Sequence, residues 1–281
     1  MSRSRSTSRF ATTVARYGFL TAGAAVMILP FVWMVLSSLM TSREVMARPL
    51  VWIPETPRFD NYAALADAVP LARMYLNSAV VTTAITAGIL LTSSLAGYGF
   101  AKFRFPGRDA LFLFVLATLM IPFFVVLIPV FYIVSRLEWV DRYPGLIVPN
   151  LVTAFGVFLM RQYMLSLPDE LLDAARVDGE SELGIFWRHV LPLSTPALGA
   201  LGILAFVFHW NSFLWPLVVA RSKEMWTIPV GLNSLRVYAS SADVLNLQMA
   251  GAALAIVPVV VVFLLLQRFF VQGIALTGIK G

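Results

Sequence analysis

The stretch that decides the fold runs from Ser166 to Pro196 and reads SLPDELLDAARVDGESELGIFWRHVLPLSTP. It is polar and acidic, and it lies between two long apolar runs. Ser166, with Asp169 three residues later, forms an approximate capping box, which predicts a helix that begins near Leu167. Gly179 tolerates the left-handed backbone that ends many helices, so it predicts a sharp turn after this helix.

A second helix is expected from Glu180 to Leu191. Its apolar residues recur at the spacing of one helix face: Leu183, Phe186, Trp187 and Val190. Pro192 then ends or kinks the helix. Two interpretations remain open at this point. The segment is either an interfacial connector that binds nothing, or a helix-turn-helix that docks on another protein.

The composition places the rest of the chain in a membrane. Of its 281 residues, 59% are hydrophobic and only 13% are charged, and the mean hydropathy is +0.82. The chain has no cysteine, which excludes disulfides and thiolate metal sites. The net charge of +6 comes from basic residues at the borders of apolar runs, a pattern that favours membrane topology over nucleic-acid binding.

Six apolar runs are long enough to span a bilayer, so the predicted fold is an all-α integral membrane protein with six transmembrane helices and the helix pair between spans 4 and 5. The predicted spans are 17–42, 74–101, 110–135, 143–162, 193–220 and 244–268. Residues 17–281 are expected to form one transmembrane domain, preceded by a disordered, arginine-rich cytoplasmic tail at 1–16.

Local composition adds detail to three of these runs. The second is rich in Thr, Ser, Ala and Gly, which predicts close packing on other helices. In the third, Pro122 and Pro129 predict kinks, and the short fourth run contains Pro144 and Pro149. The segment from Phe208 to Pro216 is expected to form the outer part of the fifth span.

The basic residues also predict the topology. With both termini inside, twelve of the 21 Lys and Arg residues lie on the cytoplasmic side and nine outside. This bias is modest but has the sign of the positive-inside rule. The helix pair is then cytoplasmic.

The spans lack charged residues away from their ends, and this absence limits the transport mechanisms that the sequence allows. Ion-coupled carriers keep acidic or basic side chains in their spans, and this chain keeps none away from the span ends, which disfavours a stand-alone secondary carrier. There is no G-x-x-x-x-G-K-[ST] phosphate loop, so ATP hydrolysis would have to come from a partner. An integral-membrane enzyme is disfavoured because the acidic residues of the helix pair lack His or Cys at metal-ligand spacing.

The sequence Asp173-Ala174-Ala175-Arg176-Val177-Asp178-Gly179, then nine residues, then His189-Val190-Leu191-Pro192, resembles the EAA loop of bacterial ABC-importer permeases. The spacing fits throughout. Three residues depart from the family pattern: Asp173 stands for the usual Glu, Glu180 for a small residue, and His189 for the usual Ile.

Other motifs are similar to the carbohydrate branch of that family, and specifically to the second permease of the maltose type. They are Phe59-Asp60-Asn61-Tyr62, Lys102-Phe103-Arg104-Phe105-Pro106-Gly107, Trp210-Asn211-Ser212-Phe213-Leu214-Trp215-Pro216-Leu217, and Phe269-Phe270-Val271-Gln272-Gly273 through Gly278-Ile279-Lys280-Gly281. The resemblance implies a heterodimer with a second permease in the bacterial inner membrane, a dimer of cytoplasmic ATPase subunits, and an external solute-binding protein. It implies no catalytic residue, metal or cofactor in this chain, since ATP and Mg are bound by the ATPase.

The resemblance also assigns roles to residues. The loop at 166–192 would insert into a groove of the ATPase as a coupling helix, with Leu171, Leu172 and Phe186 as apolar anchors. The coupling residues would be Asp173, Ala174, Ala175, Asp178, Gly179, Phe186, Leu191 and Pro192. The tail residues Lys280 and Gly281 would contact the ATPase. The loop at 221–243 resembles a segment that reaches into the binding protein, and an ordinary surface loop is the alternative.

Trp210, Asn211 and Trp215 are candidates for the substrate path, because aromatic faces stack on sugars and an amide both donates and accepts hydrogen bonds. The alternative, interfacial anchors and an interhelical hydrogen bond, is favoured, since the sugar contacts of maltose-type relatives lie mainly on the other permease. His209 is expected to be packed. The expected substrate is a neutral mono- or oligosaccharide, with glycerol phosphate or a polyol as the alternative.

Overall fold

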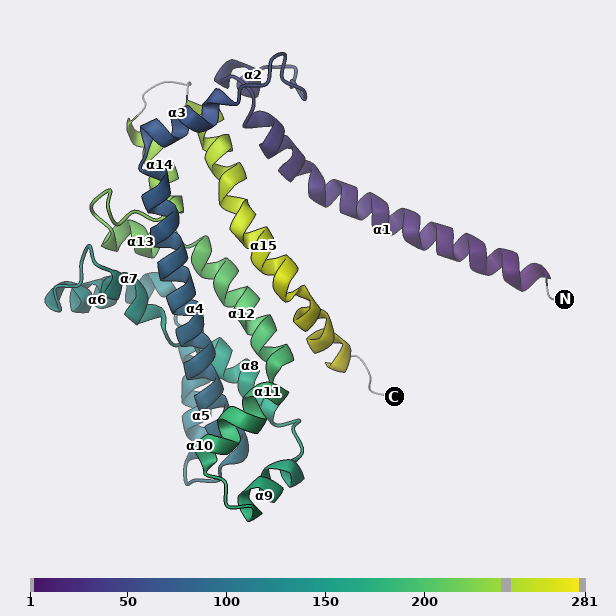
Figure 1. Cartoon of the computed structure of the whole chain (residues 1–281), viewed down its shortest axis with the longest axis vertical. Coiled ribbons are helices and arrows are strands. Elements are labelled where there is room, and N and C mark those ends of the chain that lie inside the picture. Colours follow the sequence, from purple (N-terminus) through teal and green to yellow (C-terminus); the bar gives the residue numbers. More distant parts are fainter. Residues whose placement is uncertain (1–2, 239–243, 278–281) are drawn as a thin grey trace. The chain divides into compact units, whose positions relative to one another are not determined.

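The computed structural model describes the backbone of residues 3–238 and 244–277, and the side chains of residues 12–236 and 244–268. Every regular element in these residues is a helix. The chain forms two compact units, one of residues 1–69 and 232–256 and the other of residues 70–231 and 257–281 (Figure 1). The division falls inside the helices α14 (Ile228–Tyr238) and α15 (Leu245–Thr277).

The first unit begins with one long apolar helix. Its own helices are α1 (Arg3–Ser37), α2 (Ser42–Met46) and α3 (Asp60–Ala68). Residues 12–37 of α1 are long and apolar enough to cross a membrane, and the apolar window within them is not buried by the rest of the chain. This apolar surface therefore needs lipid or protein to cover it.

A buried amide organises the polar end of the first unit. The Asn61 side chain donates to the carbonyls of Ser38 and Met40, at 2.8 and 2.9 Å, and accepts a hydrogen bond of 2.8 Å from Asn246. Asn61 lies at the start of α3, where the sequence predicts a short helix, and that prediction is confirmed. The amide thus joins three segments that are distant in the sequence.

The second unit is built around the helix α4 (Leu71–Lys102), which packs along α8 and α12 (Figure 1). The other elements are α5 (Arg108–Ala117), a 3₁₀ turn (Thr118–Met120), α6 (Phe123–Arg136), α7 (Tyr143–Ile147), a 3₁₀ turn (Val148–Asn150), α8 (Ala154–Met164), α9 (Asp169–Val177), α10 (Glu182–Ile185), a π-helical stretch (Phe186–Val190), α11 (Leu191–Leu193), α12 (Thr195–Trp210) and α13 (Leu214–Val219). Small residues of α4 face its neighbours, as the sequence predicts: Ser78, Thr82, Ser93, Ser94 and Gly97 are buried.

The helices α4 and α8 lie close together at Gly97. A Cβ atom added there would come within 2.7 Å of the Met160 Cβ and 2.9 Å of the Arg161 amide nitrogen. Only a residue without a side chain allows the two backbones to lie this close.

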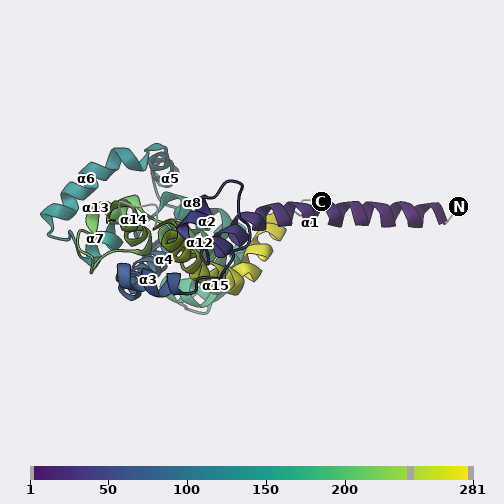
Figure 2. The same ribbon diagram turned by 90° about the horizontal axis from the view of Figure 1, so that it is seen from above.

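Three of the apolar segments are bent pairs of helices rather than single rods. The axes turn by 100° between α5 and α6, by 44° between the α7 segment and α8, and by 77° between the α10–α11 segment and α12. Figure 2 shows the sharp turn from α5 to α6. Within the described residues, three helices are long and apolar enough to span a membrane alone, and the number rises to six if each bent pair is one span, which agrees with the predicted six.

The predicted third span, 110–135, needs correction because its break is far larger than a proline kink. Pro122 lies at the break and has no N–H to donate, while Pro129 lies inside α6 without breaking it. The predicted fifth span also needs correction. The predicted segment 193–220 is not one helix, since α12 ends at Trp210, where the Asn211 side chain bonds to the Val207 carbonyl, and α13 is a separate helix.

Two further expectations are wrong. Residues 3–16 were expected to be disordered, but they continue α1, and they contain no Pro or Gly to interrupt a helix. Ser166 does not cap a helix that begins at Leu167, because its hydroxyl donates to the Tyr163 carbonyl at the end of α8. The next helix begins at Asp169, with Pro168 in the N-cap position.

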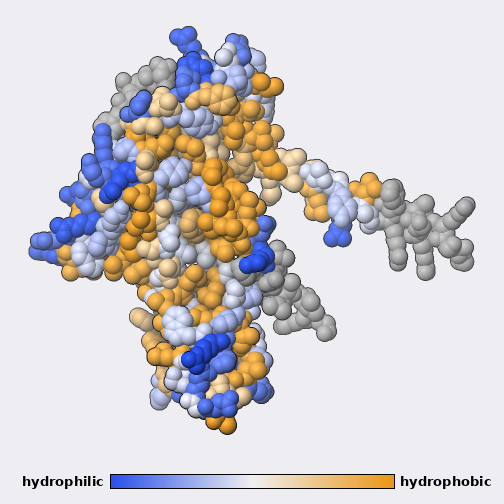
Figure 3. All heavy atoms as spheres, viewed as in Figure 1, coloured by the Kyte–Doolittle hydropathy of each residue, from blue (hydrophilic) through white to orange (hydrophobic). Residues whose placement is uncertain are grey.

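The hydropathy of the surface changes toward one end of the second unit. In Figure 3 the middle of the visible face is mainly hydrophobic, whereas the end that carries α9 and α10 mixes hydrophilic and hydrophobic residues. The polar stretch of the sequence therefore forms one end of the unit and leaves the apolar helices to the membrane.

The contact at Gly97 yields a prediction. The substitution Gly97→Val should lower stability by about 1–3 kcal/mol, because the added side chain overpacks the contact with α8. The measurement is the thermal midpoint of the detergent-solubilised protein. Gly99→Val is the matched control, since a Cβ atom at Gly99 meets nothing within 4 Å. Equal midpoints for the two variants would contradict the close approach.

Candidate functional site

The helix pair α9 and α10 turns at a glycine, as the sequence predicts. Gly179 has a φ of +80°, in the left-handed region that favours glycine. Its amide donates to the Arg176 carbonyl, and the Glu180 amide donates to the Ala175 carbonyl, both at 3.0 Å. This is the Schellman arrangement that satisfies the last carbonyls of a helix. It fixes the angle at which the chain leaves α9.

The second helix of the pair is irregular at its centre. It begins at Ser181, whose hydroxyl accepts from the Gly184 amide at 3.2 Å, and it widens into the π-helical stretch before Pro192. A proline cannot donate to the carbonyl four residues earlier, here Arg188, and its ring crowds that carbonyl. The π-helical stretch Phe186–Val190 contains Arg188, the residue whose carbonyl the Pro192 ring would crowd.

One face of the pair is buried against the second unit. Phe186 is 1% exposed, and its ring lies 5.6 Å from that of Tyr98 on α4, which in turn meets the Phe103 ring edge-on at 5.2 Å. The other buried residues of the pair are Leu172, Ala175, Ile185 and Val190. The pair is therefore packed onto α4 and is not a loose loop.

Four apolar side chains of the pair are exposed. Leu171 is 52% exposed, Val177 88%, Leu183 66% and Trp187 55%. Single exposed apolar residues are common on protein surfaces, but several on one short helix pair indicate a contact surface. We call these four residues the docking face.

An ionic chain joins the two helices to α4. Arg176 pairs with Asp173 at 2.6 Å and with Glu182 at 2.7 Å, and the Tyr98 hydroxyl donates to Glu182 at 2.8 Å. The guanidinium lowers the pKa of the Glu182 carboxyl, and the hydrogen bonds to Glu182 and Asp173 raise the pKa of Arg176. Arg176 and Glu182 are thus both kept ionised. Their ion pair joins α9 to α10, and Glu182 also joins α10 to α4 through Tyr98.

Glu180 forms a second ionic cluster, with two residues of the following helix. Its carboxylate oxygens lie 2.9 Å from Arg188 Nη1 and 2.7 Å from His189 Nε2, and its side chain is only 16% exposed. The hydrogen bond from His189 lowers the pKa of the Glu180 carboxyl. Two of the residues that depart from the EAA pattern are therefore partners of each other.

Lys102 ties the start of the pair to the end of α4. Its ammonium group donates to the Leu167 carbonyl and to Asp169 Oδ1, both at 2.6 Å, and its side chain is 5% exposed. The same contact lowers the pKa of the Asp169 carboxyl. Together with the Tyr98 contact, it attaches the pair to α4 at both of its helices.

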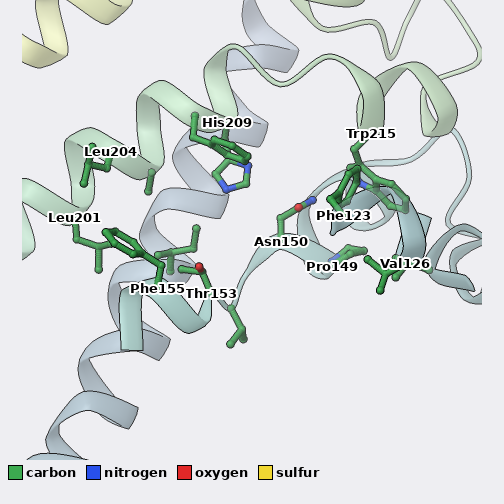
Figure 4. Close-up of a pocket in the computed structure, with 15 residues that line it drawn as sticks. Phe123, Val126, Pro149, Asn150, Thr153, Phe155, Leu201, Leu204, His209 and Trp215 are labelled. Atoms are coloured by element: carbon green, nitrogen blue, oxygen red, sulfur yellow. The ribbon is translucent and has the colours of Figure 1, made fainter. Parts of the chain in front are cut away.

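A cavity of about 600 Å³ lies elsewhere in the second unit, between α6, α8 and α12. Figure 4 shows Asn150 and His209 pointing toward the same space, with Phe123 and Trp215 on one side and Phe155 on the other. The wall contains no Lys, Arg, Asp or Glu. Its volume is in the range of small-molecule sites.

A comparison with known protein families shows to which family the chain belongs. Residues 84–276 match the model of the family described as "Binding-protein-dependent transport system inner membrane component". The chain belongs to this family. It is a multi-pass membrane permease of a transport system, and its helix pair lies where the sequence resembles the EAA loop.

Relatives of this permease serve different solutes. It is 40% identical over 262 residues to the arabinooligosaccharides transport system permease protein AraQ of Halalkalibacterium halodurans, with 92% of this chain and 93% of the relative covered. It is 35% identical to the sn-glycerol-3-phosphate transport system permease protein UgpE of Pectobacterium atrosepticum, with 91% and 93% covered.

A solved structure shares the fold. It is a chain from the crystal structure of a bacterial ABC transporter involved in the import of the acidic polysaccharide alginate. The TM-score is 0.80 at 23% identity, and the match covers 96% of this permease and 99% of that chain.

The structure assigns the predicted coupling residues of the permease to two groups. Asp173, Ala174, Asp178 and Gly179 are exposed on α9 and the turn, Leu191 is half-buried, and Pro192 is exposed. Leu172, Ala175 and Phe186 are buried, so the expectation that Leu172 and Phe186 anchor in a partner is wrong. The aromatic rings of α4 already cover Phe186. Lys280 and Gly281 lie outside the described residues.

The three predicted path residues are not brought together. Trp210 is 3% exposed and stacks on Phe206, with the ring centroids 5.5 Å apart, and Asn211 is exposed at the end of α12. Only Trp215 lines the cavity, and its Nε1 donates to the Gly145 carbonyl. His209, which we expected to be packed, is half-buried and lines the cavity as well.

Sequence reasoning missed Phe123, Asn150 and Thr153, which line the same cavity. A signal was present in the sequence. Pro122 precedes Phe123, and Pro149 precedes Asn150, and residues beside a proline in an apolar run mark backbone that is interrupted at membrane depth.

The Glu180 cluster predicts a pH dependence. Because the folded-state pKa of Glu180 is lowered, the pairing stabilises the turn fully above the ordinary carboxyl pKa and is lost as the pH falls through the lower folded value. Hydrogen-exchange protection at residues 179–184 should therefore decrease below about pH 4.5, near the unfolded carboxyl value. In Glu180→Gln this part of the pH dependence should vanish. An identical pH profile in that variant would refute the role of Glu180.

Proposed function

We propose that this permease is the transmembrane subunit of an ATP-driven importer that moves a neutral mono- or oligosaccharide into the cytoplasm by alternating access. Its partners would be a second permease, a dimer of cytoplasmic ATPase subunits and an external solute-binding protein. The observation that carries this proposal is the helix pair, which packs buried side chains against α4 and leaves four apolar side chains exposed.

The exposed and the buried side chains of the pair suit a mechanical link between the ATPase and α4. The docking face offers Leu171, Leu183 and Trp187 to a groove on the ATPase, and anchors of this kind supply most of the energy of an interface. The buried face and the Arg176 chain hold the pair to α4, so a movement of the docked pair moves α4 with it. The chain would itself hydrolyse no ATP.

A neutral sugar is favoured as the substrate by the cavity and by the relatives. An anionic solute would need a cation, and the cavity wall contains no Lys or Arg. The relative AraQ serves arabinooligosaccharides, whereas the less similar UgpE serves sn-glycerol-3-phosphate. Glycerol phosphate is thus the second candidate, supported by UgpE relatives from several organisms.

The same proposal places the helix pair and both termini in the cytoplasm and the permease in the bacterial inner membrane. The positive-inside count supports this orientation. The tail residues Lys280 and Gly281 would reach between the ATPase subunits, which rests on the motif alone. A stand-alone carrier remains disfavoured by the uncharged spans.

Two adjacent leucines allow a matched test of the docking face. Leu171 is 52% exposed, while Leu172 is 1% exposed. Leu171→Asp should reduce co-purification of the ATPase about tenfold or more, since hot-spot residues contribute 2 kcal/mol or more. It should leave the thermal midpoint of the permease unchanged.

Leu172→Ala should do the reverse. It should lower the stability of the permease by about 2–5 kcal/mol through the cavity that it leaves, with the docking face intact. Full ATPase recovery with Leu171→Asp would exclude this face as the docking site.

The turn at Gly179 gives a second test. Gly179→Pro cannot adopt a φ of +80°, since its ring fixes φ near −65°. Straining the turn costs about 1–3 kcal/mol, so ATP-dependent sugar uptake should fall about tenfold while membrane insertion and ATP hydrolysis persist.

Gly179→Asn is the control for the turn, because Asn tolerates the left-handed region better than other residues with side chains. It should retain most of the uptake. Normal uptake by a well-expressed Gly179→Pro variant would refute the coupling role of the helix pair.

A further inference from the structure

Three polar side chains of the cavity have hydrogen-bonding capacity that the described residues do not use. Asn150 donates its Nδ2 to the Leu146 carbonyl at 3.0 Å, and its Oδ1 has no partner in the described part of the chain. The same holds for the Thr153 hydroxyl and for both ring nitrogens of His209. These groups converge on one hollow, where they offer hydrogen-bonding positions to a ligand.

The rest of the wall suits a sugar ring. Phe123, Phe155 and Trp215 surround these polar groups, as Figure 4 shows, and aromatic faces pack on the apolar C–H faces of carbohydrates. Tightly placed polar groups on an apolar wall are the usual composition of small-molecule sites. The absence of charged side chains from the wall favours a neutral ligand over a phosphate or a uronate.

The backbone at the cavity supports the same interpretation. Residues 151–153 are not helical, and Ile121 and Pro122 separate the two helices of the 100° bend. Broken helices with free backbone groups mark the binding sites of many transporters, because irregular backbone at membrane depth is tolerated where it lines a polar path.

The polar lining continues beyond the cavity. A second, small hollow shares Asn150, His209 and Trp215 with it and is lined further on by Thr82, Ser212 and Thr227. The Thr227 hydroxyl is buried and has no hydrogen-bond partner in the described part of the chain. The polar side chains thus extend from the cavity into the adjoining small hollow.

We propose that Asn150, Thr153 and His209, between the rings of Phe123, Phe155 and Trp215, form a binding site for a neutral sugar on this subunit. The site rests on the proposed importer function. It differs from the expected path residues, of which it keeps only Trp215, and it gives this permease a direct role in solute recognition.

The chain has no cysteine, so single cysteines can report on the site. Thr153→Cys and His209→Cys would be introduced separately, with Ser135→Cys as the control, because Ser135 is exposed beside Arg136 and lines neither hollow. The complete importer would be produced in cells with its second permease, ATPase and binding protein. Its ATP-dependent uptake would be measured for arabinotriose, maltotriose and sn-glycerol 3-phosphate, and the panel member with the highest uptake becomes the probe.

The rate of modification by a membrane-impermeant, cationic methanethiosulfonate is then measured with and without the probe. The proposal predicts that a neutral sugar is the probe and slows modification at positions 153 and 209 at least fivefold, with no change at 135. Uptake without such protection would overturn the site and leave the importer function standing. Slow modification even without sugar would overturn it too, since the second permease or lipid would then fill the cavity.

A conservative variant covers the case in which the cysteine variants do not fold. Thr153→Val keeps the shape of the side chain and removes the hydroxyl, so the half-saturating sugar concentration should rise about fivefold, the effect of one hydrogen bond. An unaltered half-saturating concentration would overturn the role of Thr153, and transport of glycerol phosphate alone would overturn the neutral site. No uptake of any panel member would refute the proposed importer function itself.

Discussion

The side chain of Arg176 organises the ionic contact between the helix pair and α4. This guanidinium, on the first helix of the pair, binds Glu182 on the second, and Glu182 also accepts the hydroxyl of Tyr98 on α4. Exposed ion pairs contribute little by themselves, and the side chains of Arg176 and Glu182 are 34% and 42% exposed. The contact holds the pair to α4 because the buried rings of Tyr98 and Phe186 pack beside the ion pair. The ionic chain sets the geometry, and apolar burial supplies most of the free energy.

This arrangement explains why a polar stretch of about thirty residues can serve a membrane protein mechanically. The Gly179 turn fixes the angle between its helices, Lys102 holds its start, and Tyr98 holds its second helix. Contacts at both helices prevent the pair from swinging freely about either end. The exposed apolar residues are then held in one orientation, which lowers the entropy cost of docking.

Much of this architecture could be predicted from the sequence because it depends on local chemistry. Gly179 marks its own turn, the small residues of α4 mark its buried face, and the apolar runs mark the spans. Errors arose where the outcome depends on contacts that the sequence does not reveal. Ser166 looks like a helix cap, but it ends the preceding helix. Phe186 belongs to an amphipathic face, and nothing local indicates that α4 rather than a partner covers it. The size of the break at Pro122 and the pairing of Glu180 with His189 are likewise set by tertiary packing.

The most direct test of the account is the distance between the helix pair and α4 during the ATPase cycle. Spin labels at Val177→Cys on α9 and Leu95→Cys on α4 would be the only two in the permease, which has no native cysteine, and both positions are exposed. The distance distribution would be measured by pulsed electron spin resonance in the assembled importer, with and without ATP. If the pair and α4 move as one body, the mean distance changes by less than about 2 Å, the range of small shifts between packed helices. A change of about 5 Å or more, one helical turn, would contradict the rigid attachment.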